Sequence, residues 1–224
     1  MESARDRPPV AALRAGARIA NARGTPGTLG CFALTLDDGK PVMLTSQHVL
    51  FGAGGREQEP VWLTGGKPIR VARTRHGRQG TVRHASNDVY VDCATADLEI
   101  VPKGCRFVPE AAAPPVSAGD VVHKVGANSG TTRGRISDTN YSETLSIGGR
   151  NIRTSGQILV RSDDPAQPFN AAGDSGAALR NEQGAVIGLV WGRSANGGAL
   201  ACPIAPVLWV LHVQLARAIE PGAR

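Results

Sequence analysis

The sequence has few aromatic residues, few cysteines and no long apolar run. Only 4% of its 224 residues are aromatic, and no run approaches the roughly 18 apolar residues of a membrane span. C-x-x-C spacing is absent among the four cysteines, which are Cys31, Cys93, Cys105 and Cys202. We therefore predict reduced, mostly buried thiols and neither a disulfide scaffold nor a structural zinc site. Charges near the start, where a secretory signal needs an apolar core, predict a soluble cytoplasmic protein with no membrane partner.

Glycine and proline are plentiful by contrast. The chain has 28 glycines, 15 prolines and 41% hydrophobic residues. Glycine and proline together stay below the share of about 25–30% at which low-complexity disorder is expected. The length allows one large domain or two small ones. These numbers predict a folded, turn-rich protein with a substantial core.

Short β-type runs bounded by turn residues fill the chain from Gly27 onward, which favours antiparallel strands. Two hairpins are the clearest: runs 31–36 and 41–45 flank an Asp-Asp-Gly-Lys turn, and runs 176–180 and 185–191 flank Asn-Glu-Gln-Gly. A Pro-rich break over 110–119 divides the runs into two halves. We predict an all-β protein with an N-terminal arm (1–25), a first barrel (about 26–110) and a second barrel (about 118–203).

The last segment is the one convincing helix in the sequence. Pro206 suits a first helical position. From Val207 to Ile219 the apolar residues recur mostly at steps of three and four, which is typical of an amphipathic helix. We predict a C-terminal helix over about 206–219 that packs on the β body.

A basic run over 67–83 carries much of the net charge of +6. Such a stripe can neutralise phosphates. No aromatic residue interleaves with it, however, so the stacking part of single-strand recognition is missing. We favour a solvated hairpin or loop face over a nucleic-acid site.

A serine between glycines stands where a sharp turn leads into a predicted strand, in Asn170-Ala-Ala-Gly173-Asp174-Ser175-Gly176. The glycines let the backbone turn tightly and point its N–H groups inward, as an oxyanion site requires. An ordinary Gly-rich turn has the same composition. This motif alone leaves both interpretations open.

A histidine and an aspartate supply the groups that would activate such a serine. His48 ends a predicted buried strand, and Asp92 lies in the apolar run 89–94, where an unpaired carboxylate is costly to bury. The Nδ1–H of His48 would keep Asp92 ionised and leave Nε2 free to accept the proton of a serine. Asp97 is the alternative acid, but its neighbours indicate a strand exit on the surface, so we favour Asp92.

These pieces together resemble the chymotrypsin-like (trypsin-like) serine protease family, from about Gly27 to Val213. The matching motifs are Thr-Ser-Gln-His-Val (45–49), Asp-Cys-Ala (92–94), Gly-Asp-Ser-Gly (173–176) and Leu-Val-Trp-Gly (189–192). Segments 27–31 and 124–134 are similar to a bacterial intracellular branch of the family. The resemblance implies two antiparallel six-stranded β-barrels and a C-terminal helix, with residues 26–224 forming one protease domain.

The resemblance also implies roles for single residues. Ser175 would attack a peptide carbonyl, His48 would act as base and then acid, and Asp92 would orient the imidazole. The N–H groups of Gly173 and Ser175 would form the oxyanion hole. Trp191 and Gly192 would line one wall of the primary specificity pocket. No cofactor and no metal are implied.

The sequence departs from secreted members in two places. It has no cysteine over 49–60 for the disulfide after the histidine, and no Ile-Val-Gly-Gly sequence that cleavage could free to pair with the aspartate before the nucleophile. We therefore predict that Asp174 has a cation other than the chain N-terminus, or awaits an activating partner. Counting back six residues from Ser175 makes Phe169 the base of the pocket, which suggests a small or hydrophobic preference.

The function predicted is that of a serine endopeptidase with a narrow range of protein or peptide substrates. A binding or scaffold module with a protease fold and a latent site is the alternative, because the activation device is missing. A nucleic-acid-binding protein acting through the basic run is a third and less favoured interpretation.

Overall fold

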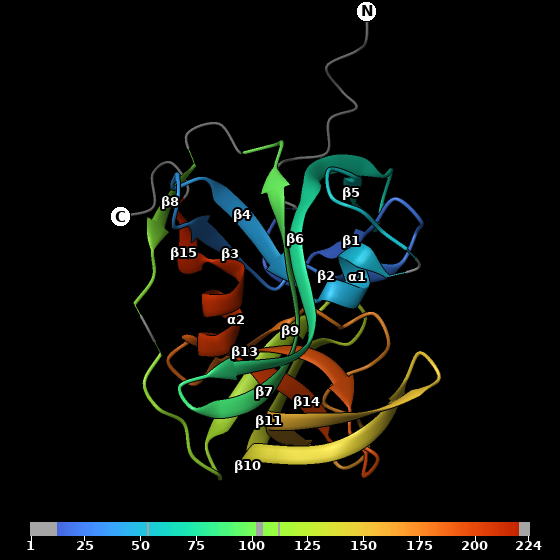
Figure 1. Cartoon of the computed structure of the whole chain (residues 1–224), viewed down its shortest axis with the longest axis vertical. Helices are drawn as coiled ribbons and strands as arrows, with labels where there is room; N and C mark the ends of the chain where they lie inside the picture. The colour runs from blue at the N-terminus through green and yellow to red at the C-terminus, as the bar shows by residue number, and fades with distance from the viewer. Residues whose placement is uncertain (1–12, 53, 102–104, 112, 220–224) are drawn as a thin grey trace, which may run out of the picture.

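A computed structural model describes residues 13–52, 54–101, 105–111 and 113–219. Two antiparallel sheets make up the body, one in the upper half of Figure 1 and one in the lower half. The fold is all-β, as predicted. Within these residues no helix is long and apolar enough to span a membrane.

The first sheet has nine strands in the order β2-β1-β5-β6-β7-β4-β3-β15-β8. The predicted hairpin of 31–36 and 41–45 is confirmed, because β3 and β4 pair from Cys31 with Leu44 to Leu34 with Pro41. The strands of this sheet are β1 (Arg18–Ala20), β2 (Pro26–Thr28), β3 (Cys31–Thr35), β4 (Pro41–Thr45), β5 (Pro60–Leu63), β6 (Ile69–His84), β7 (Asn87–Leu98), β8 (Arg106–Pro109) and β15 (Val213–Ile219).

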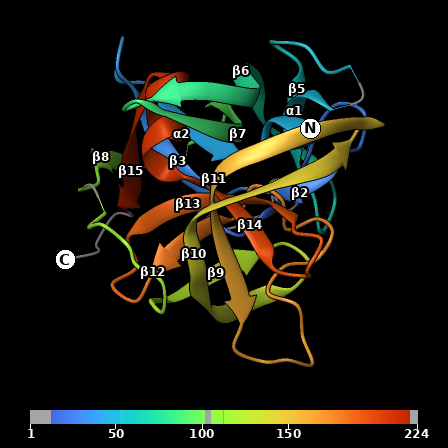
Figure 2. The ribbon, with the colours of Figure 1, turned by 60° about the horizontal axis from the view of Figure 1, so that its bottom comes forward.

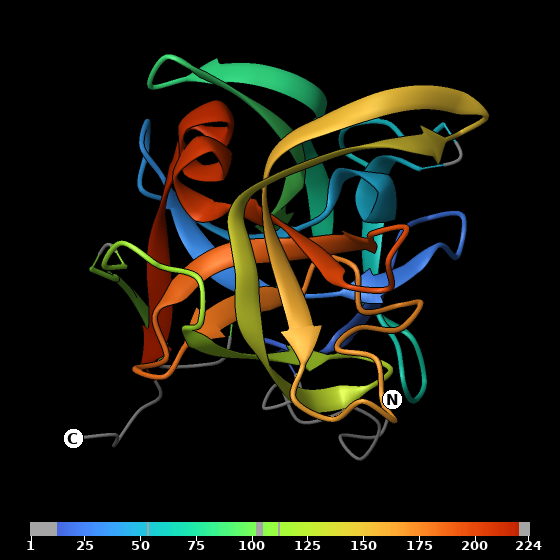
Figure 3. The same cartoon turned by 90° about the horizontal axis from the view of Figure 1, so that it is seen from below.

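The second sheet closes into the six-stranded barrel that the resemblance implies, in the order β10-β11-β14-β13-β12-β9. The predicted second hairpin is confirmed as β12 and β13. Figures 2 and 3 show the long β10–β11 hairpin projecting from this barrel. The strands are β9 (Val121–Gly126), β10 (Gly130–Ile147), β11 (Arg150–Ser162), β12 (Ala178–Asn181), β13 (Val186–Arg193) and β14 (Ala199–Pro203).

The C-terminal segment differs from the prediction. Helix α2 covers only Ile204–Leu211, and His212 ends it in the left-handed conformation, with φ 55° and ψ 50°. The chain then continues as strand β15, which pairs with β3 and β8 of the first sheet. The predicted helix is therefore wrong from Val213 onward. Apolar residues four apart, such as Leu211, Leu215 and Ile219, fit one face of a strand as well as one face of a helix.

Two further features differ from the sequence prediction: the extent of the N-terminal arm and the number of strands in the first sheet. Part of the predicted N-terminal arm is strand β1, which pairs with β2 and β5, whereas residues 1–12 lie outside the described part of the chain. The first sheet has nine strands rather than the six expected, because β1, β2 and β15 add to it. Both ends of the described chain thus complete the same sheet.

The two sheets share buried side chains. One core cluster takes Val91 from β7 of the first sheet and Leu189 and Trp191 from β13 of the second. Cys31, Cys93 and Cys202 are buried free thiols, as predicted. The common core fixes the position of one sheet against the other.

The basic run of 67–83 forms most of the long strand β6 rather than a loop. Several of its arginines pair with acidic residues on or just after β7: Arg70 and Arg73 with Glu99, Arg75 with Asp97, and Arg83 with Asp88. Part of its positive charge is therefore compensated within the protein.

Candidate active site

Three segments bring the predicted catalytic residues to the junction of the two sheets. His48 lies on the five-residue helix α1 (Gln47–Phe51), directly after strand β4. Asp92 lies in the middle of β7, where eight successive residues are buried. Ser175 lies on the turn before β12, and its carbonyl accepts from the N–H of Thr28 on β2.

His48 and Asp92 form the predicted pair. The distance from His48 Nδ1 to Asp92 Oδ2 is 2.8 Å, and the backbone N–H of His48 donates to Asp92 Oδ1 at 3.1 Å. The Asp92 side chain is 1% exposed and that of His48 is 35% exposed. One carboxylate thus holds both the ring and the backbone of the histidine.

Two partners of Asp92 were missed by the sequence analysis. Gln79 on β6 donates from Nε2 to Asp92 Oδ2 at 2.9 Å. The N–H of Asp92 donates to the thiol sulfur of Cys202, 3.2 Å away. Strand register explains the contact of Gln79, because Gln79 lies directly opposite Asp92 in the β6–β7 pair. A hairpin prediction for β6 and β7 with the correct register would have found it.

Asp97, the alternative acid, does not reach the histidine. Its carboxylate accepts from Arg75 at 3.1 Å, and both side chains are 33% exposed. Asp97 stands near the end of β7, on the surface as expected. Asp92, and not Asp97, is therefore the carboxylate that contacts His48.

The environment of His48 shifts its pKa upward. Burial of the ring acts to lower the pKa, but the hydrogen bond with Asp92 and the charge of that carboxylate outweigh burial, so the pKa lies above the ordinary value of 6.5. The imidazole is thereby a stronger base than a free histidine.

The hydroxyl of Ser175 is hydrogen-bonded to a backbone carbonyl. Its Oγ donates to the carbonyl of Trp191, 3.2 Å away. Within the described part of the chain, no hydrogen bond joins Ser175 to His48. In proteins without bound substrate, hydrogen bonds between catalytic groups are often long or unformed. Rotation about the Cα–Cβ bond frees the hydroxyl from Trp191.

The turn around Ser175 presents two unused backbone donors. The N–H groups of Gly173 and Ser175 donate to no acceptor among the described residues, whereas the N–H of Asp174 donates to the carbonyl of Ala171 at 3.0 Å. Gly176 has a φ of 92°, and a Cβ there would collide with Thr45 Oγ1 and the carbonyl of Thr28. Glycine is therefore required at 176, and the two free N–H groups are suited to an anion.

Comparison with known proteins gives matches in structure only. No protein-family model and no curated protein sequence matches the chain. Among solved structures, Nocardiopsis protease is 16% identical, with a TM-score of 0.61, covering 91% of this chain and 98% of that one. Protease A of Thermobifida fusca is 14% identical (TM-score 0.61, 91% and 97% covered), and a glutamic acid specific serine protease is 18% identical (0.60, 91% and 100%). The chain has the chymotrypsin-like serine protease fold.

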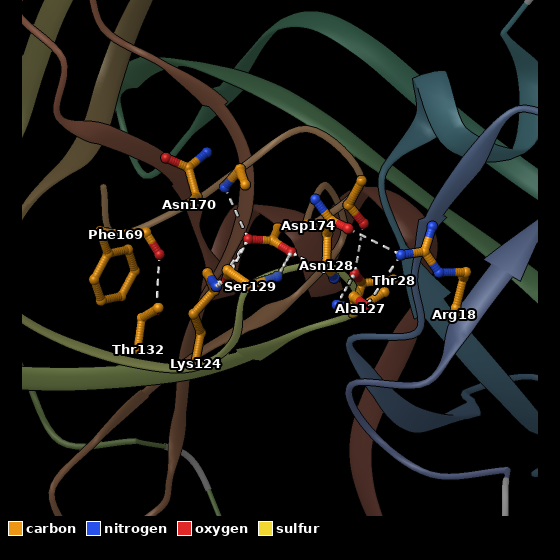
Figure 4. Close-up of polar contacts among 12 residues, drawn as sticks. Arg18, Thr28, Lys124, Ala127, Asn128, Ser129, Thr132, Phe169, Asn170 and Asp174 are labelled. Atoms are coloured by element: carbon orange, nitrogen blue, oxygen red, sulfur yellow. Dashed lines mark hydrogen bonds and ion pairs between the residues drawn. The ribbon is translucent and has the colours of Figure 1, made fainter. Parts of the chain in front are cut away.

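Within this protease fold, Asp174 has a cation, which was the first of the two alternatives left open by the sequence. Lys124 on β9 places Nζ 3.0 Å from Asp174 Oδ2, and both side chains are 0% exposed (Figure 4). Lys124 Nζ also donates to Ser129 Oγ at 2.6 Å. Lys124 was not predicted, although a lysine within the strand-like run Asp120–Val125 signals a carboxylate buried beside it.

Four further donors complete the shell of Asp174. The N–H groups of Asn128 and Ser129 reach Oδ1, while the Ser129 hydroxyl and the N–H of Ala171 reach Oδ2. Burial alone would raise the pKa of Asp174, but these hydrogen bonds and Lys124 outweigh it and hold the pKa below its usual 3.8. Burial lowers the pKa of Lys124, although Asp174 opposes that shift. The pair fixes the residue next to the nucleophile.

Of the residues predicted to bind substrate, Trp191 contacts Ser175 and Phe169 lines a cavity. Phe169 is 2% exposed, and it lines a cavity of about 410 Å³ between the segments 161–169 and 193–198. Asn170 donates from Nδ2 to the carbonyl of Gly192 at 3.0 Å, which joins the two walls next to that cavity.

Trp191 is buried instead of facing a pocket. Its indole N–H donates to Gln157 Oε1 at 2.7 Å, and its ring lies 5.1 Å from that of Tyr90. The Trp191 carbonyl, which accepts from Ser175, is the part of this residue that faces the site. Any contact of Trp191 with a substrate therefore falls to its backbone.

Proposed function

We propose that the protein is a serine endopeptidase that hydrolyses peptide bonds through an acyl-enzyme. The observation that carries this proposal is the 2.8 Å contact between His48 Nδ1 and buried Asp92, beside a serine turn with two free N–H groups. Asp92 holds the proton of His48 on Nδ1, which leaves Nε2 able to accept one. The protease fold supports peptides as the general class of substrate.

The reaction needs one rotation of the Ser175 side chain, and each of its two halves needs two proton transfers through His48. Ser175 Oγ leaves the Trp191 carbonyl and bonds to the substrate carbonyl carbon, while its proton passes to His48 Nε2. The negative oxygen that results accepts from the N–H groups of Gly173 and Ser175. The C–N bond then breaks as His48 returns the proton to the amine, and a water molecule repeats the sequence to release the acid and restore Ser175.

The specificity proposed is for a small or hydrophobic side chain. The support for this preference is that Phe169, an uncharged residue, lies in the wall of the cavity of about 410 Å³, which also carries Arg161, Asp164 and Arg193. A narrow substrate range and a cytoplasmic location complete the proposal.

Labelling with a fluorophosphonate tests the proposed activity, because this reagent bonds to an activated serine hydroxyl. We expect the folded protein to be labelled at Ser175, the Ser175→Ala variant to remain unlabelled, and Ser117→Ala, which changes an exposed serine, to react like the wild type. Mass spectrometry of the digested protein identifies the labelled residue.

The alternative function, a binding module with a latent site, rests on the Ser175 hydroxyl being bonded to Trp191 and not to His48. It predicts no labelling of the folded wild-type protein. It also predicts that Ser175→Ala leaves the cellular phenotype intact. Absence of labelling would therefore contradict the proposed peptidase and favour the binding module.

The rate of labelling should increase with pH through the pKa of His48. Only the neutral imidazole accepts a proton, and the pKa of His48 is raised above 6.5 by Asp92. The midpoint of the rate-against-pH curve is therefore expected above 6.5. A raised pKa also means that this pair stabilises the fold fully below about pH 6.5, and that the contribution is lost as the pH rises through the midpoint. A midpoint at or below 6.5 would contradict the pairing of His48 with an ionised Asp92.

A further inference from the structure

A single buried threonine of the first sheet binds the nucleophile turn on both sides of Ser175. Thr28 ends β2 and is 0% exposed. Its hydroxyl donates to the carbonyl of Gly173 at 2.8 Å, and its N–H donates to the carbonyl of Ser175 at 2.9 Å. The N–H of Ser175 belongs to the peptide group between the two that Thr28 holds. Thr28 therefore restricts how this oxyanion donor can turn.

The same hydroxyl also fastens the turn that clamps Asp174. It accepts from the N–H of Ala127 at 3.0 Å, and the next residue, Asn128, donates its N–H to Asp174 Oδ1. Arg18 on β1 holds this turn from the other side, through the carbonyl of Ala127 at 3.3 Å and Asn128 Oδ1 at 3.1 Å. Figure 4 shows Arg18 and Thr28 reaching the turn from the first sheet.

Thr28 is also linked to the histidine side of the site. Its carbonyl accepts from Thr45 Oγ1 at 2.7 Å, and Thr45 ends the strand that leads into α1 and His48. All the polar groups of Thr28 are thus used within the site. Such complete pairing of a buried residue favours one fixed geometry for the groups it contacts.

We propose that Thr28 is a positioning residue, which sets the orientation of the oxyanion donors from the first sheet. Its effect on rate rests on the proposed function, whereas its effect on the conformation of the turn does not. The hydroxyl acts by holding the carbonyl of Gly173 and the N–H of Ala127 in place. It has no bond to His48 or Asp92, so the proton transfers should be unaffected.

The test compares Thr28→Val with a matched control in the full-length protein. Valine keeps the shape of threonine but loses the hydroxyl. Thr74→Val is the control, because Thr74 is also 0% exposed and its hydroxyl also joins a backbone carbonyl, that of Arg56, to a backbone N–H, that of Glu59. Thr28→Ser, which restores the hydroxyl, should recover wild-type behaviour.

Two measurements are made on each variant. In hydrogen exchange followed by mass spectrometry, we expect faster exchange over residues 171–176 in Thr28→Val and wild-type exchange there in Thr74→Val and Thr28→Ser. In fluorophosphonate labelling, we expect the plateau rate of Thr28→Val to fall about tenfold or more, since losing an oxyanion donor outright costs about 10²–10³. The pH midpoint of labelling should not move.

The outcomes separate this inference from the proposed function. Unchanged exchange over 171–176 in Thr28→Val would overturn the positioning role, whether or not Ser175 is labelled. Faster exchange in a protein whose wild type is never labelled would support the positioning role and refute the peptidase. A shifted pH midpoint, or an equal loss of rate in Thr74→Val, would show a general disturbance of the fold and would also overturn it.

Discussion

Replacing Asp92 with asparagine is expected to lower the rate of peptide hydrolysis, and of labelling at Ser175, by about 10⁴-fold. Losses of this size follow when the aspartate of such a triad becomes an amide and the histidine takes the wrong tautomer. The variant should remain folded, because asparagine has nearly the same shape. Second-order labelling rate constants and thermal unfolding, measured together, check both expectations.

The tautomer argument comes from the two oxygens of Asp92. Oδ1 accepts from the backbone N–H of His48. A backbone N–H cannot accept a hydrogen bond, so the NH₂ group of an asparagine would have no partner at the position of Oδ1. The NH₂ of an asparagine would therefore take the place of Oδ2, facing His48 Nδ1. The Gln79 amide, which donates to Oδ2 in the wild type, would turn over and accept through its oxygen. Nδ1 would then have to accept, so the proton would sit on Nε2, the atom that must receive the proton of Ser175.

The control is Asp97→Asn, which makes the same change five residues away. Asp97 is paired with Arg75 on the surface and has no contact with His48. Its variant should be labelled at the wild-type rate. If Asp97→Asn and Asp92→Asn lost rate equally, or if neither did, Asp92 would not be the group that orients His48.

Local patterns in the sequence were sufficient for much of this fold. The Asp-Gly turn between β3 and β4 and the glycine turn between β12 and β13 specify hairpins through a few adjacent residues. The buried acid Asp92 could be predicted because a lone carboxylate in an apolar strand needs a partner. Each of these inferences depends on residues close together in the sequence, or on a charge that must be neutralised.

The residues that were missed act through contacts between distant segments. Gln79 reaches Asp92 through strand register, Lys124 reaches Asp174 from another strand, and Thr28 reaches the nucleophile turn from the other sheet. No local pattern identifies which residue of the site each of these contacts, although the lysine within a strand-like run did signal a buried carboxylate. The segment after His212 was mispredicted for a related reason, since its pairing with β3 and β8 decides between helix and strand.

Replacing Lys124 with methionine is expected to destabilise the protein by about 3–5 kcal/mol, as is typical when a buried charge loses its partner. That is a large share of the roughly 5–15 kcal/mol that stabilises most domains. Four hydrogen-bond donors would remain on Asp174, but no positive charge. Urea unfolding measures the loss, and labelling of Ser175 should weaken in parallel because Asp174 adjoins the nucleophile.

Lys40→Met is the matched control, because Lys40 also pairs with an aspartate but lies on the surface. The Lys40 side chain is 67% exposed and contacts Asp38 at 2.6 Å. Exposed pairs of this kind contribute little to stability because water and salt screen them, so the control should unfold nearly like the wild type. Equal losses in the two variants would mean that burial does not strengthen the Lys124–Asp174 pair.

Acid provides a second and independent signature of the buried pair. Asp174 has a pKa below 3.8 in the folded wild type, so its contribution to stability is present above that pH and is lost as the pH falls through the folded pKa. Once Asp174 is protonated, the attraction that Lys124 supplies is gone in the wild type as well. The difference in unfolding free energy between Lys124→Met and the wild type should therefore shrink below about pH 4. A difference that stayed constant with pH would assign the loss to packing of the lysine stem and not to its charge.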